Sequence, residues 1–363
     1  SLGTLKFENA HYGLIDSLNQ TFLSVYLPYG KFQMEAIDFE TGLVDVGSAD
    51  IRQPKVALLI DESLRTDTQK AKTGPDTMHI LPKNLTIHYT DVCLTNGNFS
   101  LRNLRGDTVS TGMDFNDMEV TGIQLDVSDG GLIRDTIFAD IEYLAGKEKC
   151  GMEILTMKSK TRVSTTGIFC DSLYLKTLDS EISNYIALTF NGFSAFSNFI
   201  TEVRMEGDFE NSRISMEEIN YFAKALDPIA HNNVGISGKV SGTVSNLRGR
   251  DLQLALGNRT TFDGKFSLMG LPNIKETFIS FDCEELKTNY SDLKKIYPSV
   301  EYPSEIGRLG NVNFKGNFDG FINNFVTYGE LKTDIGSISS DINLELVDGP
   351  EQGSYSGSLA MNS

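Results

Sequence analysis

The stretch that decides the fold is LKTLDSEISNYIALTF (175–190), which recurs as LKTDIGSISSDINLEL at 331–346. Both copies keep Leu-Lys-Thr, then an Ile-Ser pair, and then apolar residues at alternate positions. A weaker copy, TTFDGKFSLMG (260–270), has its threonine 84 residues after that of the first copy and 72 residues before that of the last. Such internal similarity predicts a repeat protein in which like units stack on their neighbours.

Alternation of apolar and polar residues indicates the secondary structure of these units. In 252–256 every second residue is leucine, and 123–127 and 342–346 alternate in the same way. Period two predicts strands with one apolar and one polar face. Four pairs are typical of hairpin turns and favour an antiparallel meander: Asn96-Gly97, Asp129-Gly130, Asp263-Gly264 and Asp319-Gly320. The segment 126–131 fails the calcium-loop pattern and is also interpreted as a turn.

Three short helices are expected among the strands. Ser215 followed by Glu218 fits a capping box, and an apolar stripe continues from there until Pro228 ends it. A second helix is predicted over 291–297, and a third, weaker one over 135–144. The predicted fold is therefore all-β, a long curled antiparallel sheet that forms a repeating β-groove, with a few short connector helices.

The repeats suggest a division of the chain. We expect an N-terminal β-meander portion over 1–133 and three repeat units over 134–212, 213–289 and 290–363, as a fragment of a longer chain. The polar stretch at 62–80 is interpreted as an exposed loop. No apolar run approaches the ~20 residues that cross a bilayer.

Composition excludes several classes of function. A net charge of −17 argues against nucleic acid as a partner, because phosphate binding relies on Lys and Arg. The four cysteines (Cys93, Cys150, Cys170 and Cys283) form no Cys-x-x-Cys pair, so no metal site is expected. Their disulfide state stays open, although Cys93 and Cys283 are expected to be buried free thiols. No nucleophile motif, zinc motif or phosphate loop occurs, so we predict no catalytic residues and no cofactor.

The apolar face is then the candidate functional feature. A single sheet needs a second sheet, a curl of its own or a ligand to cover its apolar side. A partly curled sheet would form a trough suited to acyl chains, which need no placed hydrogen bonds. The expected lining residues are Ile182, Ile186, Leu188, Phe190, Leu252, Leu254, Leu256, Ile338, Ile342, Leu344 and Leu346.

Two long segments carry a family resemblance. Residues 234–298 and 307–346, with Gly-Leu-Pro at 270–272 and Leu-Lys-Thr at 331–333, resemble the TamB proteins of Gram-negative bacteria, in the AsmA-like superfamily, and specifically their Bacteroidetes branch. Segments 98–106 and 147–154 are similar to upstream parts of the same proteins. The resemblance spans most of the chain from about residue 85.

The resemblance implies a function. TamB-like proteins are anchored in the inner membrane by a segment that would lie outside this chain, and they extend through the periplasm. They are linked to phospholipid movement towards the outer membrane and to outer-membrane protein assembly with a barrel partner. Phospholipid acyl chains and that barrel are the implied partners. The alternative is a structural β-solenoid spacer or a glycan-binding surface protein, although solenoid rungs of 20–30 residues fit the long spacing poorly.

Overall fold

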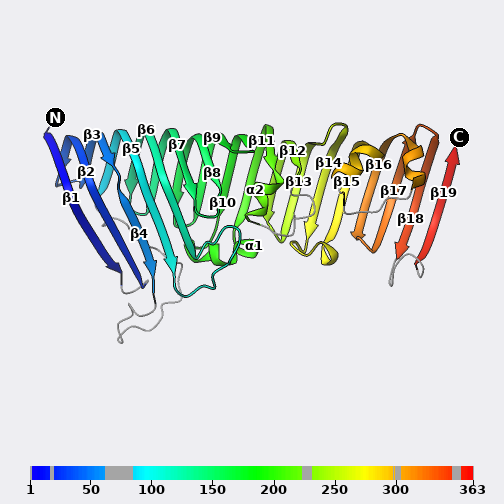
Figure 1. The fold of residues 1–363 in the computed structure, drawn as a ribbon, viewed down its shortest axis with the longest axis horizontal. Helices are drawn as coiled ribbons and strands as arrows, with labels where there is room; N and C mark the ends of the chain where they lie inside the picture. Colours follow the sequence, from blue (N-terminus) through cyan, green and yellow to red (C-terminus); the bar gives the residue numbers. More distant parts are fainter. Residues whose placement is uncertain are drawn as a thin grey trace. The chain divides into compact units, whose positions relative to one another are not determined.

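The computed structural model describes residues 2–16, 20–61, 85–222, 231–296, 298, 304–345 and 353–362. Within these residues the chain is all-β, with nineteen strands and three short α-helices, as the alternation predicts (Figure 1). Two compact units are distinguished: unit 1 is 1–178 with 184–203, and unit 2 is 179–183 with 204–363. The predicted boundaries at 133/134, 212/213 and 289/290 stay predictions.

Unit 1 contains the longest strands. Each hairpin-linked pair from β5 to β9 is antiparallel, and β10 pairs with β9. The elements are β1 (Gly3–Asp16), β2 (Thr21–Asp38), β3 (Leu43–Arg52), β4 (Lys55–Ile60), β5 (Thr86–Asn103), β6 (Asp117–Ile133), β7 (Thr136–Glu148), β8 (Glu153–Ser164), β9 (Gly167–Thr177), β10 (Glu181–Thr189), the 3-10 helix η2 (Phe193–Asn198) and α1 (Phe199–Glu202).

The N-terminal part of unit 1 is not the simple meander predicted for 1–133. Strands β3 and β4 run one after the other along β2, antiparallel to it, and both pair in parallel with β5. A parallel partner requires the chain to return along the full strand length before pairing. The loop predicted at 62–80, between β4 and β5, lies outside the described residues.

Unit 2 is an antiparallel succession of shorter strands, each paired with the next from β11 to β19. The elements are β11 (Arg204–Ser215), α2 (Met216–Asn220), β12 (Asn233–Thr243), β13 (Asn246–Leu256), β14 (Thr260–Met269), η4 (Ile274–Glu276), β15 (Phe278–Asn289), α3 (Tyr290–Ile296), η5 (Ser304–Leu309), β16 (Asn311–Phe321), β17 (Asn324–Thr333), β18 (Gly336–Glu345) and β19 (Ser354–Asn362).

The two strong repeat copies occupy the same kind of place. Residues 175–190 cover the end of β9, a tight turn and β10, and 331–346 begin with the end of β17, a tight turn and β18. The weak copy at 260–270 differs, because it coincides with β14 and contains no turn. The Leu-Lys-Thr motif therefore marks a strand end in the strong copies only.

The Asn-Gly and Asp-Gly pairs are the largest error of the sequence interpretation. All four lie inside strands, in β5, β6, β14 and β16, and the whole of 126–131 lies within β6. At several of these places the strand bends: Asn96 has φ 53° and Gly264 has φ 155°. The pairing register also shifts beside Gly97 and Gly264, as it does at a β-bulge. The positive φ of these residues therefore bends the strand and does not reverse the chain.

The helix predictions have mixed outcomes. Helices α2 and α3 form where they were expected, and 223–230 lies outside the described residues. The helix predicted over 135–144 is wrong, because those residues belong to β7. The register of β7 shifts between Ile141 and Leu144, so the two side chains fall on one face three residues apart. A bulge thus produced a spacing that resembles a helical period.

The strands of unit 1 bend until their opposite ends meet. Phe115 lies two residues before the start of β6, whereas Phe199 lies in the connection that follows the far end of β10. Nevertheless the two rings stack, with centroids 5.2 Å apart, and α1 lies beside the β5–β6 loop (Figure 1). A straight strand of 17 residues, the length of β6, would hold its ends about 55 Å apart. Unit 1 is therefore curled across its strands.

Candidate functional site

One face of unit 1 is apolar in continuous rows that cross the strands. Cross-strand pairing joins seven residues from β2 to β9: Ile37, Val44, Ile87, Leu132, Ile137, Val163 and Ile168. A parallel row joins Phe7, Gly30, Ile51, Leu94, Leu125, Leu144, Met157 and Leu175. Side chains opposed in this way contact one another, so each row is a continuous apolar strip, except at Gly30, which has no side chain. The larger side chains are half-buried or exposed, as expected when no second layer covers them.

This face is hollowed in the N-terminal half of unit 1. A cavity of about 260 Å³ is lined only by apolar residues and Tyr89, from β2, β3, β5 and β6. Two of its lining residues, Val46 and Ala49, form a small buried core together with Met34. Tyr89 donates its hydroxyl to the carbonyl of Phe138 at 3.0 Å, so its polar atom is satisfied within the sheet. Apart from this hydroxyl the side chains that line the hollow are apolar, so it suits a hydrocarbon.

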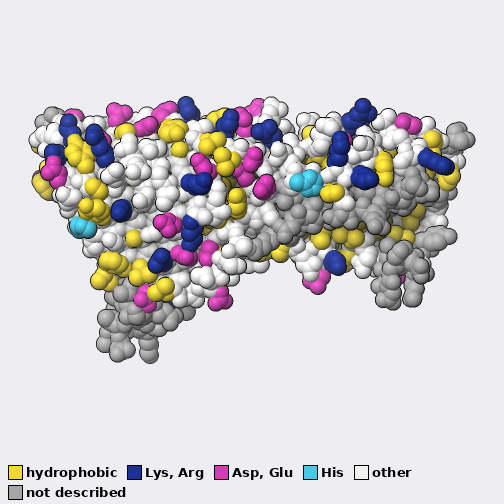
Figure 2. All heavy atoms as spheres, viewed as in Figure 1, with side chains coloured by type: hydrophobic (Ala, Val, Ile, Leu, Met, Phe, Trp, Pro, Cys, Tyr) yellow, Lys and Arg dark blue, Asp and Glu magenta, His cyan; other side chains and the backbone are white. Residues whose placement is uncertain are grey.

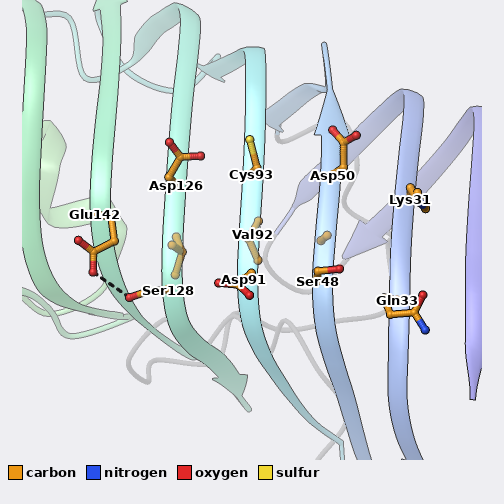
Figure 3. Close-up of a pocket in the computed structure, with 12 residues that line it drawn as sticks. Lys31, Gln33, Ser48, Asp50, Asp91, Val92, Cys93, Asp126, Ser128 and Glu142 are labelled. Carbon is orange, nitrogen blue, oxygen red and sulfur yellow. Dashed lines mark hydrogen bonds between the residues drawn. The ribbon is translucent and has the colours of Figure 1, made fainter. Parts of the chain in front are cut away.

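The opposite face of the same strands is polar. A hollow of about 480 Å³ there is lined by Lys31, Asp50, Asp91, Asp126 and Glu142, with Ser128 donating to Glu142 at 2.9 Å (Figure 3). Figure 2 shows charged side chains of both signs interspersed over the surface turned to the viewer. The charged side chains that line this hollow thus lie on the face opposite the apolar cavity.

All four cysteines are free thiols, but Cys93 is exposed and not buried as predicted. It lies exposed on the polar face, because Val92 and not Cys93 has the inward parity in β5. A hydrogen bond to the Asp126 carboxylate, with partial burial, raises the pKa of the Cys93 thiol. Burial raises the pKa of Cys283 to about 11, so this thiol stays protonated at neutral pH.

Unit 2 repeats the apolar rows with aromatic side chains. One row joins Ile236, Leu254, Phe262, Leu286, Phe314, Leu331 and Ile338. A second joins Phe266, Phe281, Phe318, Thr327 and Ile342. Phe281 and Phe318 stack with centroids 5.1 Å apart, and Phe318 contacts Phe325 at 4.6 Å. These rings are half-buried, so the row presents part of its surface outwards.

A line of small residues separates these two rows. Gly264, Cys283, Gly316 and Gly329 are consecutive cross-strand partners, and Gly238 lies at the equivalent bulge of β12. A Cβ at Gly238 would stand 2.2 Å from the carbonyl oxygen of Asp251, and at Gly316 2.1 Å from that of Tyr328. Phe262 and Phe281, from the rows on either side, meet edge to face at 6.4 Å. The strands of unit 2 therefore bend inwards along this glycine seam.

The outer face of unit 2 carries its charges in cross-strand pairs. Lys239 contacts Asp208 at 3.4 Å and Lys265 contacts Asp282 at 2.9 Å. Each side chain is at least a third exposed, so solvent screens both pairs and they contribute little to stability. These pairs matter for where they lie, because their charged side chains are on the face opposite the apolar rows.

In unit 2, carboxylates of helices α2 and α3 accept hydrogen bonds from turns between strands. Asp292 of α3 is buried and accepts from the backbone N–H groups of Asn258 and Arg259, in the β13–β14 turn. Glu218 of α2 is also buried and accepts from Ser180 and from the N–H of Asp179, in the β9–β10 turn. The capping box predicted for Ser215 and Glu218 is therefore wrong: Ser215 makes no side-chain cap, and Glu218 binds another turn.

The predicted lining residues fall into three groups. Register places Leu252, Leu254, Leu256, Ile338, Ile342 and Leu344 on one face of unit 2, although Leu252 is fully buried. Leu188 and Phe190 pack under the connection 191–203 with Ile168, while Ile182 and Ile186 are half-buried in β10. Leu346 lies outside the described residues. The sequence interpretation missed the rows of unit 1 before residue 175, although alternation at 123–127 signals one of them.

His88 of β5 contacts both neighbouring strands on the polar face of unit 1. Its Nδ1 lies 2.9 Å from Asp45 of β3 and its Nε2 lies 3.1 Å from Asp129 of β6. The hydrogen bond to Asp45 is the main cause that raises the pKa of His88, with Asp129 acting in the same direction. The side chain thus contacts both neighbouring strands, as well as solvent.

The described residues contain no group of three or more His, Cys, Asp or Glu side chains placed to hold a metal ion. In the same residues no helix has the length and apolar character that crossing a bilayer requires. Comparisons with protein-family models, curated proteins and solved structures gave no match to this chain.

Proposed function

We propose that the apolar face of each unit is a trough that binds the acyl chains of phospholipids and lets them move along it. The observation that carries the proposal is the continuity of the half-exposed apolar rows, across β2 to β9 in unit 1 and β12 to β18 in unit 2. No charged residue interrupts these rows. The glycine seam and the curl of unit 1 support the concave form that such a trough needs.

Hydrocarbon is the ligand class that this surface favours. Each buried methylene contributes about 0.8 kcal/mol, so a single long acyl chain gains roughly 10 kcal/mol before the entropy of its ordering is subtracted. The rows offer such a chain continuous apolar contact and no directional hydrogen bond. Sugars need the reverse, because their hydroxyls must be paired, and the apolar cavity in unit 1 offers no group for that purpose.

The resemblance of the sequence to TamB proteins supports a proposal for the cellular setting of this trough. We propose a segment of an inner-membrane-anchored periplasmic protein that conducts phospholipids towards the outer membrane, with a role in outer-membrane protein assembly beside a barrel partner. A structural spacer is the competing function. It differs in one property that can be measured directly, because a spacer would hold no lipid.

Site-specific photo-crosslinking tests the proposal. The photoreactive amino acid p-benzoylphenylalanine replaces Phe318, which belongs to an apolar row, and in a matched variant it replaces Asn317, the exposed neighbour with opposite parity. Each variant is irradiated with vesicles of radiolabelled phosphatidylethanolamine and phosphatidylglycerol. We expect at least five times more lipid adduct at 318 than at 317. Equal labelling at both positions, or none at either, would reject the trough in favour of a spacer.

A further inference from the structure

Five phenylalanines gather where the two ends of the strands of unit 1 meet. Phe190, Phe193, Phe196 and Phe199 come from the end of β10 and the connection 191–203, and Phe115 comes from the β5–β6 loop. Phe196 contacts Phe190 at 4.9 Å and Phe115 at 5.5 Å, and Phe115 stacks on Phe199 at 5.2 Å with an interplanar angle of 7°. We call this group the phenylalanine clasp. It joins opposite margins of one curled sheet.

The connection 191–203 is fixed to its own margin. Phe190 and Gly192 donate their N–H groups to the carbonyls of Thr166 and Thr165, in the β8–β9 turn. Ala195 and Val203 are buried, at 1% and 0% exposure, and pack with Leu188 and Ile168. Since Ile168 ends one apolar row of unit 1, this connection lies on the apolar face.

The β5–β6 loop is equally well fixed to the other margin. Buried Asp114 accepts from the N–H groups of Val109 at 3.0 Å and Asn116 at 2.9 Å. The N–H of Asn103, at the end of β5, donates to the carbonyl of Asn116 at 2.7 Å. These bonds hold the backbone on both sides of Phe115. The loop therefore presents that ring from a defined position.

We propose that the phenylalanine clasp is a strap that closes the trough of unit 1 between β6 and β10, and that a ligand passes this point only when Phe115 separates from Phe199. The inference rests on the proposed function for the identity of the ligand. The strap is held by ring contacts between two margins, whereas each margin has its own backbone hydrogen bonds. Separation at the rings consequently leaves both anchored segments in place, which is the property a gate requires.

A reversible cross-link tests the strap. Phe115→Cys and Phe199→Cys are combined with Cys93→Ser and Cys150→Ser, which remove the exposed and half-buried thiols. A short bismaleimide containing a disulfide joins the pair, and dithiothreitol releases it. The control pairs Phe199→Cys with Phe39→Cys, which is 93% exposed and follows β2 at the same margin as 191–203. Seven or more strand spacings, about 35 Å, separate that pair.

The readout is the rate at which fluorescent phosphatidylethanolamine moves from vesicles to the full chain. We expect efficient cross-linking of 115 with 199 and little of 39 with 199. We also expect at least fivefold slower lipid uptake in the cross-linked chain, with recovery after reduction. Phe115→Ser, which removes the ring without a cross-link, should speed uptake about threefold. Its thermal unfolding confirms that the variant is folded.

Three results would overturn the strap. They are failure of the 115–199 pair to cross-link, unchanged uptake after cross-linking, or slower uptake with Phe115→Ser. Failure of the proposed function gives a different result, because the 115–199 pair would still cross-link while no variant, including the wild type, takes up lipid.

Discussion

The two units share one way of bending their strands, and unit 2 adds a second. In unit 1 the bend falls on residues with side chains, such as Asn9, Gln53 and Asn96, with φ between 52° and 53°. Unit 2 has such residues too, Asn211 (φ 47°) and Asp251 (φ 49°), but it also bends along the glycine seam, where Gly238 has φ 113° and a neighbouring backbone leaves no room for a Cβ. The left-handed conformation at φ near 53° costs an asparagine little, whereas the conformation at Gly238 is accessible essentially to glycine alone. A strand bend at Asn96 should therefore tolerate substitution better than the bend at Gly238.

The sharpest test of this comparison is Gly238→Ala in unit 2. The new Cβ would stand 2.2 Å from the Asp251 carbonyl oxygen, at a φ that alanine rarely adopts. We expect a loss of at least ~3 kcal/mol in the free energy of unfolding of unit 2. Urea denaturation measures it. Gly235→Ala is the matched control in the same strand, because its Cβ would meet nothing closer than 3.4 Å. A similar loss in both variants would contradict the seam.

The counterpart in unit 1 is Asn96, at the bend of β5. Asn96→Ala should lower the free energy of unfolding by roughly 1–2 kcal/mol, because alanine pays the full penalty of the left-handed conformation. Asn96→Gly should remain within about 0.5 kcal/mol of the wild type, since glycine removes that penalty but gains freedom in the unfolded chain. The same urea titration applies. If alanine and glycine behave alike at this position, the bend does not depend on the positive φ.

The smallest effect concerns His88 of β5 in unit 1, which contacts Asp45 of β3 and Asp129 of β6. Because its folded pKa is raised, the stabilisation is fully present below the unfolded pKa of about 6.5 and is lost as pH rises through the folded pKa. His88→Gln should therefore lose more stability at pH 5.5 than at pH 8.5. The difference is about 0.5 kcal/mol, since the side chain is 42% exposed. Equal losses at the two pH values would show that the ion pairs contribute nothing.

The sequence predicted the strands correctly where the burial of one strand face sets the spacing of the apolar residues. Alternation at 252–256 and 338–346 predicted strands and their shared face, because an apolar face must be kept out of water whatever its neighbours are. It failed at 135–144, where one extra residue in β7 changed a spacing of two into three. A bulge depends on the partner strand, so period counting along a single strand does not reveal it.

The residues of this chain determine by themselves that it forms strands and which face of each strand is apolar. They also determine where a strand can adopt a positive φ. Tertiary structure alone decided that Asn96-Gly97 and Asp263-Gly264 bend a strand and do not reverse the chain, that β5 pairs in parallel with β3, and that Phe115 meets Phe199. The physical reason is that backbone conformation is a local property. Whether a bent chain continues or turns back depends on which distant N–H and C=O groups are available to pair with it.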